Sequence, residues 1–251
     1  MAAGRVLVGG ASADKPARLV APGEPIELIG PGPRFVSRGG EKLDAALDRF
    51  GLDVRGLRVL DAGSSTGGFT DCLLQRGAAN VVALDVGRNQ LHERLRADAR
   101  VTVRERTNLR GMSGDDLGGR FDLVVADLSF ISLRTVAEPL LSLARPGAHE
   151  VLLVKPQFEA GKEEADRGRG VITDPEVWHR VLTEVDDALR GRGAAIMEAM
   201  VSPLRGSSGN VEFLVHVVAP GGPAPTSTAP FDPSAVVREA SGAPDDPVGR
   251  A

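Results

Sequence analysis

The stretch from Leu57 to Phe69 constrains the fold most, because an apolar run there meets an acid and then a loop rich in glycine and hydroxyl groups. Leu57, Val59 and Leu60 are typical of a parallel strand that helices cover on both faces. The glycines allow a sharp turn and the close approach of a ligand, and a helix is expected from Gly68. Open α/β sheets bind nucleotide-like ligands at such loops, although a tight strand-to-helix turn without a ligand is the alternative.

The composition of this loop indicates which ligand it suits. The segment from Gly63 to Gly68 reads Gly-Ser-Ser-Thr-Gly-Gly, which is neither the G-x-G-x-x-G of dinucleotide folds nor a P-loop. The acid just ahead of the loop, Asp61, would repel a diphosphate. A ligand that is uncharged or cationic fits better, and S-adenosylmethionine carries a sulfonium and an ammonium group. The candidate cofactor-binding residues here are Asp61, Gly63, Ser64, Ser65, Thr66, Gly67, Gly68 and Phe69.

Two further residues extend the predicted cofactor site. Asp85 ends a second apolar strand about 20 residues beyond the glycine loop, where an acid can accept hydrogen bonds from both hydroxyls of a ribose. Thr107 or Asn108, after a third strand at 101–103, can bond an adenine edge, but a loop cap is equally compatible with either residue.

Ionisable residues end several of the predicted strands. A fourth strand at 121–127 ends in Asp127, and a fifth at 149–155 ends in Lys155. The carboxyl ends of parallel strands meet at one edge, so these side chains and Asp61 and Asp85 are expected along one rim of the sheet. A purely structural sheet has no need for this arrangement.

The remaining segments supply two more candidates. Residues 37–50 have the apolar spacing of a helix, and Lys42 lies beside its apolar stripe. A helix is expected from Asp174, followed by strands at 194–204 and 209–218, with Glu212 early in the last strand. The long polar loop at 157–173 is typical of a lid or a substrate contact.

Composition bounds the class of protein. With 251 residues, 42% hydrophobic and 25% charged, the chain suits one soluble α/β domain with appendages. It contains no run of about 18 apolar residues and no secretory signal at its start, so we expect a cytoplasmic protein that does not contact membranes. The single cysteine, Cys72, gives neither a disulfide nor a metal site. The net charge of −4 requires any polyanionic partner to meet a local basic patch.

Five separated motifs resemble one family in the right order. They are Ser37-Arg-Gly-Gly-Glu-Lys-Leu, Leu60-Asp-Ala-Gly-Ser-Ser-Thr-Gly-Gly-Phe-Thr, Asp127-Leu-Ser-Phe-Ile-Ser, Leu153-Val-Lys-Pro-Gln-Phe-Glu and Ser207-Ser-Gly-Asn-Val-Glu. Together they resemble the TlyA (hemolysin A) family, which is similar to the FtsJ-type ribosomal RNA 2′-O-methyltransferases. The resemblance implies a class I (Rossmann-like) methyltransferase fold, with a seven-stranded, mostly parallel sheet whose last strand is antiparallel.

The resemblance also implies a division into domains. Residues 1–30 resemble the carboxyl-terminal half of an S4 RNA-binding domain, so we expect a partial S4-like β segment without its helical half. Residues 31–36 would be a linker, residues 37–218 an FtsJ-like methyltransferase domain, and the Pro- and Gly-rich residues 219–251 a disordered tail. With half of the S4 domain absent, RNA binding would depend on Arg34, Arg38, Arg167 and Arg169.

The chemistry follows from the same resemblance. It implies a catalytic tetrad of Lys42, Asp127, Lys155 and Glu212, with S-adenosyl-L-methionine as cofactor and no metal. Lys155 is the candidate base, because a neighbouring cation such as Lys42 would lower the pKa of its amine, while the two carboxylates orient the reacting groups. The implied substrate is cytidine ribose in ribosomal RNA of the small or large subunit, or both.

Other functions remain open from sequence. A methyltransferase for a small molecule or protein would share the cofactor loop without needing the tetrad. An RNA-binding or cofactor-sensing module would bind the cofactor with little turnover. A pore-forming function has the least support, because no segment has the large apolar face that a membrane requires. The sequence does not indicate the oligomeric state.

Overall fold

The computed structural model describes residues 6–15, 17–30, 32–161, 163–164, 168–222 and 231–242. It divides into two compact units, one up to Arg34 and the other from Phe35 onward. In the first, β1 (Val6–Val8) pairs antiparallel with β2 (Ala11–Ser12) and with β3 (Ile26–Leu28). This matches the expected short strands separated by turns, while the relation to an S4 domain remains a prediction.

The second unit contains a seven-stranded sheet with the strand order β6-β5-β4-β7-β8-β10-β9. The strands β4 to β8 pair in parallel, and β10 is antiparallel to both of its neighbours. The predicted fold class is therefore confirmed. The strands are β4 (Arg58–Ala62), β5 (Asn80–Leu84), β6 (Val101–Arg104), β7 (Phe121–Ala126), β8 (Ala144–Val154), β9 (Ala195–Val201) and β10 (Phe213–Val218).

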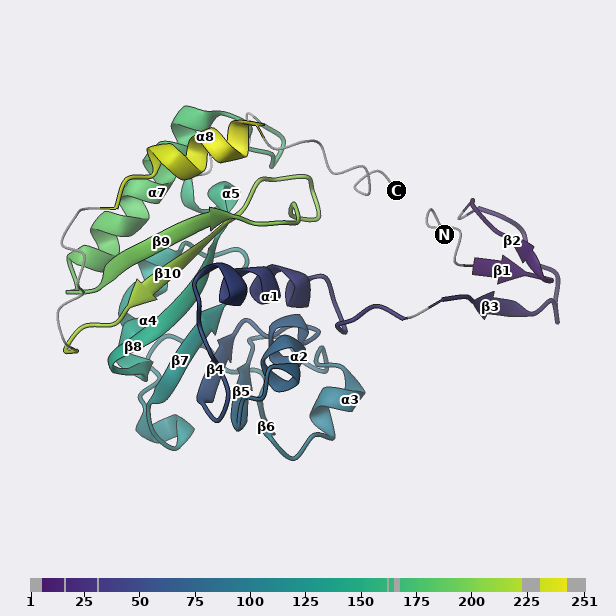
Figure 1. The fold of residues 1–251 in the computed structure, drawn as a ribbon, viewed down its shortest axis with the longest axis horizontal. Helices are drawn as coiled ribbons and strands as arrows, with labels where there is room; N and C mark the ends of the chain where they lie inside the picture. Colours follow the sequence, from purple (N-terminus) through teal and green to yellow (C-terminus); the bar gives the residue numbers. More distant parts are fainter. Residues whose placement is uncertain are drawn as a thin grey trace. The chain divides into compact units, whose positions relative to one another are not determined.

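Helices cover both faces of this sheet (Figure 1). On one face lie α1 (Gly39–Arg49), α2 (Gly68–Gln75) and α3 (Glu93–Arg96), and on the other lie α4 (Leu133–Leu143) and α7 (Pro175–Arg190). Alternate strand residues serve the two layers: Leu123 and Val125 pack beneath α1 and α2, whereas Val124 packs toward α4 and α7. The short elements are η1 (Asp115–Leu117) and α5 (Pro156–Glu159).

Two boundaries differ from the expectation. The supposed disordered tail contains α8 (Ser234–Gly242), whose Val236, Val237 and Ala240 are buried in the core that α4 and α7 share. The Pro- and Gly-rich composition concealed these three apolar residues, and residues 223–230 and 243–251 lie outside the described part. Phe35, expected in a linker, is buried against Gly40 in the core of the second unit.

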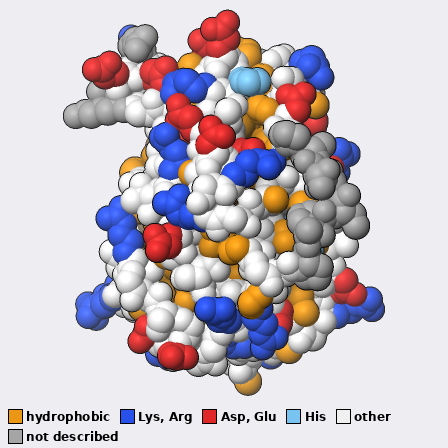
Figure 2. Space-filling view, turned by 90° about the vertical axis from the view of Figure 1, so that its left-hand side faces the viewer, with side chains coloured by type: hydrophobic (Ala, Val, Ile, Leu, Met, Phe, Trp, Pro, Cys, Tyr) orange, Lys and Arg blue, Asp and Glu red, His pale blue; other side chains and the backbone are white. Residues whose placement is uncertain are grey.

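The surface of the second unit carries mixed charge. On the face drawn in Figure 2, basic and acidic side chains are interspersed among the described residues. This pattern agrees with the small net charge of −4. Within the described ranges, none of the helices has the length and apolar composition needed to cross a bilayer.

Glu150 is an unusual core residue, because it lies in the middle of β8 with no exposed surface. Its register partners are Val124 in β7 and Val217 in β10, and no described group donates a hydrogen bond to its carboxyl oxygens. Burial raises the pKa of Glu150 to about 8. The folded protein therefore favours the protonated, uncharged acid.

We predict that Glu150 makes the free energy of unfolding depend on pH. Its contribution is fully present below its ordinary pKa of 4.5 and is lost as pH rises through about 8, because the folded state binds the proton more tightly. Glu150→Gln should flatten the fall in melting temperature across this window, and Glu138→Gln, at an exposed position, should not. Calorimetry at stepped pH measures both, and equal slopes for wild type and Glu150→Gln would contradict the assignment.

Candidate cofactor and acceptor site

The glycine loop leaves the sheet between β4 and β5. The backbone N–H groups of Gly63 and Ser64 donate to the Leu84 carbonyl at 2.8 and 3.1 Å. Gly63 has φ +84°, and a Cβ there would lie 2.5 Å from the carbonyl oxygen of Asp127. Gly67 has φ +97°, and a Cβ there would lie 2.3 Å from a methyl carbon of Leu95. Both positions therefore require glycine for backbone conformation and for space.

Asp61 lies beneath this loop rather than at its surface. The side chain has no exposed area, and one carboxyl oxygen accepts a hydrogen bond of 2.6 Å from the Thr70 hydroxyl. Burial raises the pKa of Asp61 to about 7, helped by the charges of Asp127 and Asp85 and opposed by the Thr70 hydrogen bond. The expectation that Asp61 faces a ligand is not met, because Asp61 lines neither of the two cavities described below. It instead anchors the first turn of α2.

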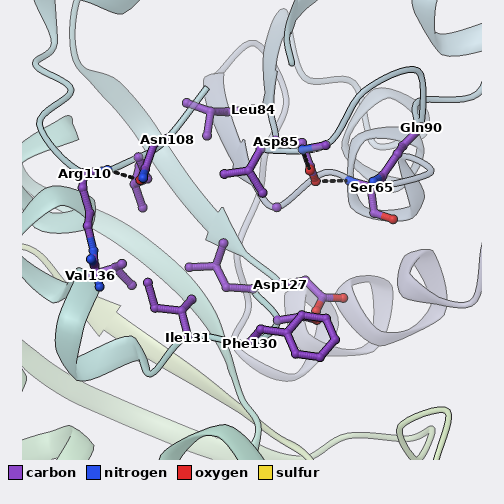
Figure 3. Close-up of a pocket in the computed structure, with 16 residues that line it drawn as sticks. Ser65, Leu84, Asp85, Gln90, Asn108, Arg110, Asp127, Phe130, Ile131 and Val136 are labelled. Carbon is purple, nitrogen blue, oxygen red and sulfur yellow. Dashed lines mark hydrogen bonds between the residues drawn. The ribbon is translucent and has the colours of Figure 1, made fainter. Parts of the chain in front are cut away.

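A first cavity of about 670 Å³ opens beside β5 (Figure 3). Asp85 accepts hydrogen bonds from the backbone N–H groups of Ser65 at 2.8 Å and Gly87 at 2.6 Å, which fix its carboxylate. The side chain of Asn108 also lines the cavity, and its oxygen accepts a hydrogen bond of 2.9 Å from the backbone N–H of Arg110. The apolar wall consists of Leu84, Val86, Leu109, Leu128, Ile131 and Val136.

A second cavity of about 490 Å³ contains all four tetrad candidates. Lys42 Nζ lies 2.5 Å from a carboxylate oxygen of Glu212, and Lys155 Nζ lies 2.6 Å from one of Asp127. Lys155 Nζ also donates to the Ser129 hydroxyl at 2.9 Å. Lys42 and Lys155 are only 8% and 9% exposed. The carboxylate partner of each lysine compensates for the removal of its charge from water.

Four separate elements bring these side chains together. Lys42 projects from the buried side of α1, and Lys155 occupies the N-cap position of α5 directly after β8. Asp127 follows β7, where its backbone N–H donates to the Ala62 carbonyl at 3.1 Å. Glu212 lies just before β10 rather than within it, and its carbonyl accepts from Ser202 N–H at 2.9 Å.

The two cavities adjoin. Their shared lining residues are Gly63, Ser65, Asp127 and Ser129. The expected residues Ser64, Thr66, Gly68 and Phe69 line the second cavity, whereas Gly67 lines neither. Several lining residues were not among the sequence candidates, although the first two of them lie inside a motif quoted above. They are Ser129, Phe130, Gln90, Arg110 and Arg205.

The four arginines expected to contact RNA have different positions. Arg38 lines the second cavity, and its guanidinium donates to the carbonyl of Arg205 at 2.7 Å. Arg169 is exposed on the loop before α7, while Arg34 belongs to the first unit. Arg167 lies outside the described residues.

Comparisons with known proteins identify the family. The family model for FtsJ-like methyltransferases matches residues 35–218, which hold both cavities. The chain belongs to the FtsJ-like methyltransferase family. Its methyl donor is S-adenosylmethionine, and the first cavity of this FtsJ-like domain fits that molecule, because it offers the Asp85 carboxylate and an apolar wall.

Individual relatives agree with this family. The chain is 49% identical over 214 residues to the 16S/23S rRNA (cytidine-2′-O)-methyltransferase TlyA of Mycobacterium tuberculosis, covering 85% of this chain and 80% of the relative. It is 36% identical over 217 residues to Hemolysin A of Brachyspira hyodysenteriae, covering 86% and 90%. A solved structure from Streptococcus thermophilus, provisionally named a hemolysin, matches with a TM-score of 0.79 and 39% identity over 95% of this chain and 86% of its own.

We predict that Gly63→Ala weakens S-adenosylmethionine binding on the order of tenfold, because the added Cβ must push away the Asp127 loop that lines both cavities. Gly56→Ala is a matched control. Gly56 also has a positive φ of +73°, but a Cβ there meets no atom within 4 Å. Both variants should lose about 1–2 kcal/mol of stability from the left-handed backbone. Titration calorimetry should find weaker cofactor binding in Gly63→Ala alone, and equal affinities would refute the steric argument.

Proposed function

We propose that this FtsJ-like enzyme is a ribosomal RNA 2′-O-methyltransferase that acts on cytidine ribose in the ribosomal subunits of the cytoplasm. The observation that carries the proposal is the pair of buried lysine–carboxylate contacts in a cavity that adjoins the cofactor cavity. The names of the 16S/23S and 23S rRNA (cytidine-2′-O)-methyltransferase relatives support cytidine as the acceptor.

The first cavity would hold the cofactor. The Asp85 carboxylate retains lone pairs that can accept from ribose hydroxyls, because its two backbone donors occupy only part of its capacity. Asn108 and the apolar side chains would hold the adenine. When bound, S-adenosylmethionine supplies a methyl group on a positively charged sulfur, and its transfer to the ribose oxygen leaves a neutral thioether.

The two lysines differ in how accessible their partners are. The Glu212 side chain is 4% exposed, so the Lys42–Glu212 pair is largely inaccessible to solvent. The Asp127 side chain beside Lys155 is 24% exposed. Asp127, the partner of Lys155, also lines both cavities, whereas Glu212 and the two lysines line only the second. Lys155 is therefore the better candidate for the base that takes the proton of the 2′-hydroxyl as its oxygen attacks the methyl carbon. Lys42 would remain a fixed cation that orients the acceptor.

An exposed aromatic residue supports RNA as the acceptor. Phe130 is 91% exposed and adopts φ +64°, an uncommon conformation for a bulky residue. Its ring lies 5.2 Å from that of Phe158, centroid to centroid, on the rim of the first cavity. Unpaired nucleobases stack on such exposed rings, so Phe130 would hold the base of the target nucleotide.

We predict that Lys155→Ala lowers methyl transfer by about 10²–10⁴-fold, the usual contribution of a general base, while the Kd for S-adenosylmethionine changes by less than a few-fold. The assay uses labelled methyl groups on intact small and large subunits, with mapping of the modified nucleotide. Arg55→Ala is the control, because Arg55 is an exposed residue that lines neither cavity. Methylation of a small molecule or a protein instead of RNA, or cofactor binding without turnover, would overturn the proposal.

We also predict that Phe130→Ala raises the KM for the ribosomal subunit by about 10-fold or more, since base stacking is worth roughly 1–3 kcal/mol. Phe130→Trp keeps an aromatic face and should stay close to wild type. Steady-state kinetics with subunits measures both variants. An unchanged KM in Phe130→Ala would exclude this ring as the stacking platform.

A further inference from the structure

Ser129 occupies the junction between the two cavities. It lies two residues after Asp127, is exposed, and is one of only four residues that line both cavities among the described lining residues. The other three are Asp127 and two loop residues, Gly63 and Ser65. If the cofactor occupies one cavity and the acceptor ribose the other, the methyl group must cross at this junction.

The path of the loop fixes the position of the Ser129 hydroxyl. Gly63 packs so closely on the Asp127 carbonyl that a Cβ would approach to 2.5 Å, and Asp127 N–H donates to Ala62. One residue beyond the serine, Phe130 holds the left-handed conformation. The Lys155 Nζ group then donates to Ser129 Oγ at 2.9 Å and contacts Asp127 at 2.6 Å.

We infer that Ser129 is a positioning residue for methyl transfer, which directs the lone pair of the Lys155 amine toward the acceptor hydroxyl. The inference rests on the proposed function. A neutral amine has two N–H groups and one lone pair. With one N–H donated to Ser129 and the Asp127 carboxylate held 2.6 Å from the same nitrogen, the amine is fixed on two sides and its lone pair is confined to the directions that remain.

The serine hydroxyl suits this task in both states of the lysine. The hydroxyl is uncharged, so it can accept a hydrogen bond from the neutral amine or from the ammonium and favours neither form strongly. The negatively charged Asp127 carboxylate, in contrast, favours the ammonium. When the 2′-hydroxyl gives its proton to Nζ, the O–H bond breaks and a third N–H bond forms. Neither the hydrogen bond to Ser129 nor the ion pair with Asp127 has to break during this step.

The test compares three variants in the subunit assay. Ser129→Ala should lower kcat by about 10-fold or more, because an amine free to rotate about its Cε–Nζ bond loses the oriented lone pair. The KM for the subunit and the Kd for S-adenosylmethionine should stay within about twofold. Ser129→Thr keeps a hydroxyl and should recover most of the loss. Ser142→Ala, on α4 and away from both cavities, should match wild type.

The outcomes separate this inference from the proposed function. If wild type does not methylate subunit RNA, the proposed function fails. If wild type is active and Ser129→Ala has the same kcat, the function stands and the inference is overturned. A rise in the Kd for S-adenosylmethionine with kcat unchanged would also overturn it, because Ser129 would then serve cofactor binding. Melting temperatures of all three variants control for folding.

Discussion

The site depends on the parallel pairing of β4, β7 and β8, because this register brings distant ionisable residues to one edge. Ala62 pairs with Ala126, which places Asp127 just beyond the end of β4. On the other side of β8, Phe213 pairs with Val154, so Glu212 and Lys155 each stand one residue beyond the last pair. The backbone hydrogen bonds between the strands therefore fix the positions of these charged residues.

Buried charges normally destabilise a fold, so the way each one is compensated is informative. The two lysines each contact a carboxylate, which offsets the several kcal/mol that removing an ion from water costs. Glu150 has no such partner, and burial instead raises the pKa of its carboxyl group until the acid is neutral. The cost of burying an ionisable group is therefore offset in two ways, by pairing at the two lysines and by protonation at Glu150.

Much of this arrangement was predictable from sequence, because strand ends are readable as apolar runs that stop at a charged residue. Asp85, Asp127 and Lys155 were located in this way, and the family resemblance implied the fold class that the sheet order confirms. The predictions that failed were those that depended on how deeply a side chain is buried and on which residues it contacts. The sequence could not indicate that Asp61 is sealed beneath its loop, or that a serine in the motif after β7 would contact Lys155. Both are properties of packing between segments distant in the chain.

The asymmetry between the two lysine pairs follows from the elements that carry them. Lys42 comes from a helix whose apolar side is packed against the sheet, so its amine is held in the wall of the cavity and meets the largely buried Glu212. Lys155 comes from the end of β8, where the chain turns into a four-residue helix, and its amine contacts Asp127 and Ser129, which line both cavities. A group that exchanges a proton with a substrate needs access to it, whereas a fixed cation needs only proximity. The topology of the sheet therefore gives two equally buried lysines different surroundings, and this difference supports the roles proposed for them.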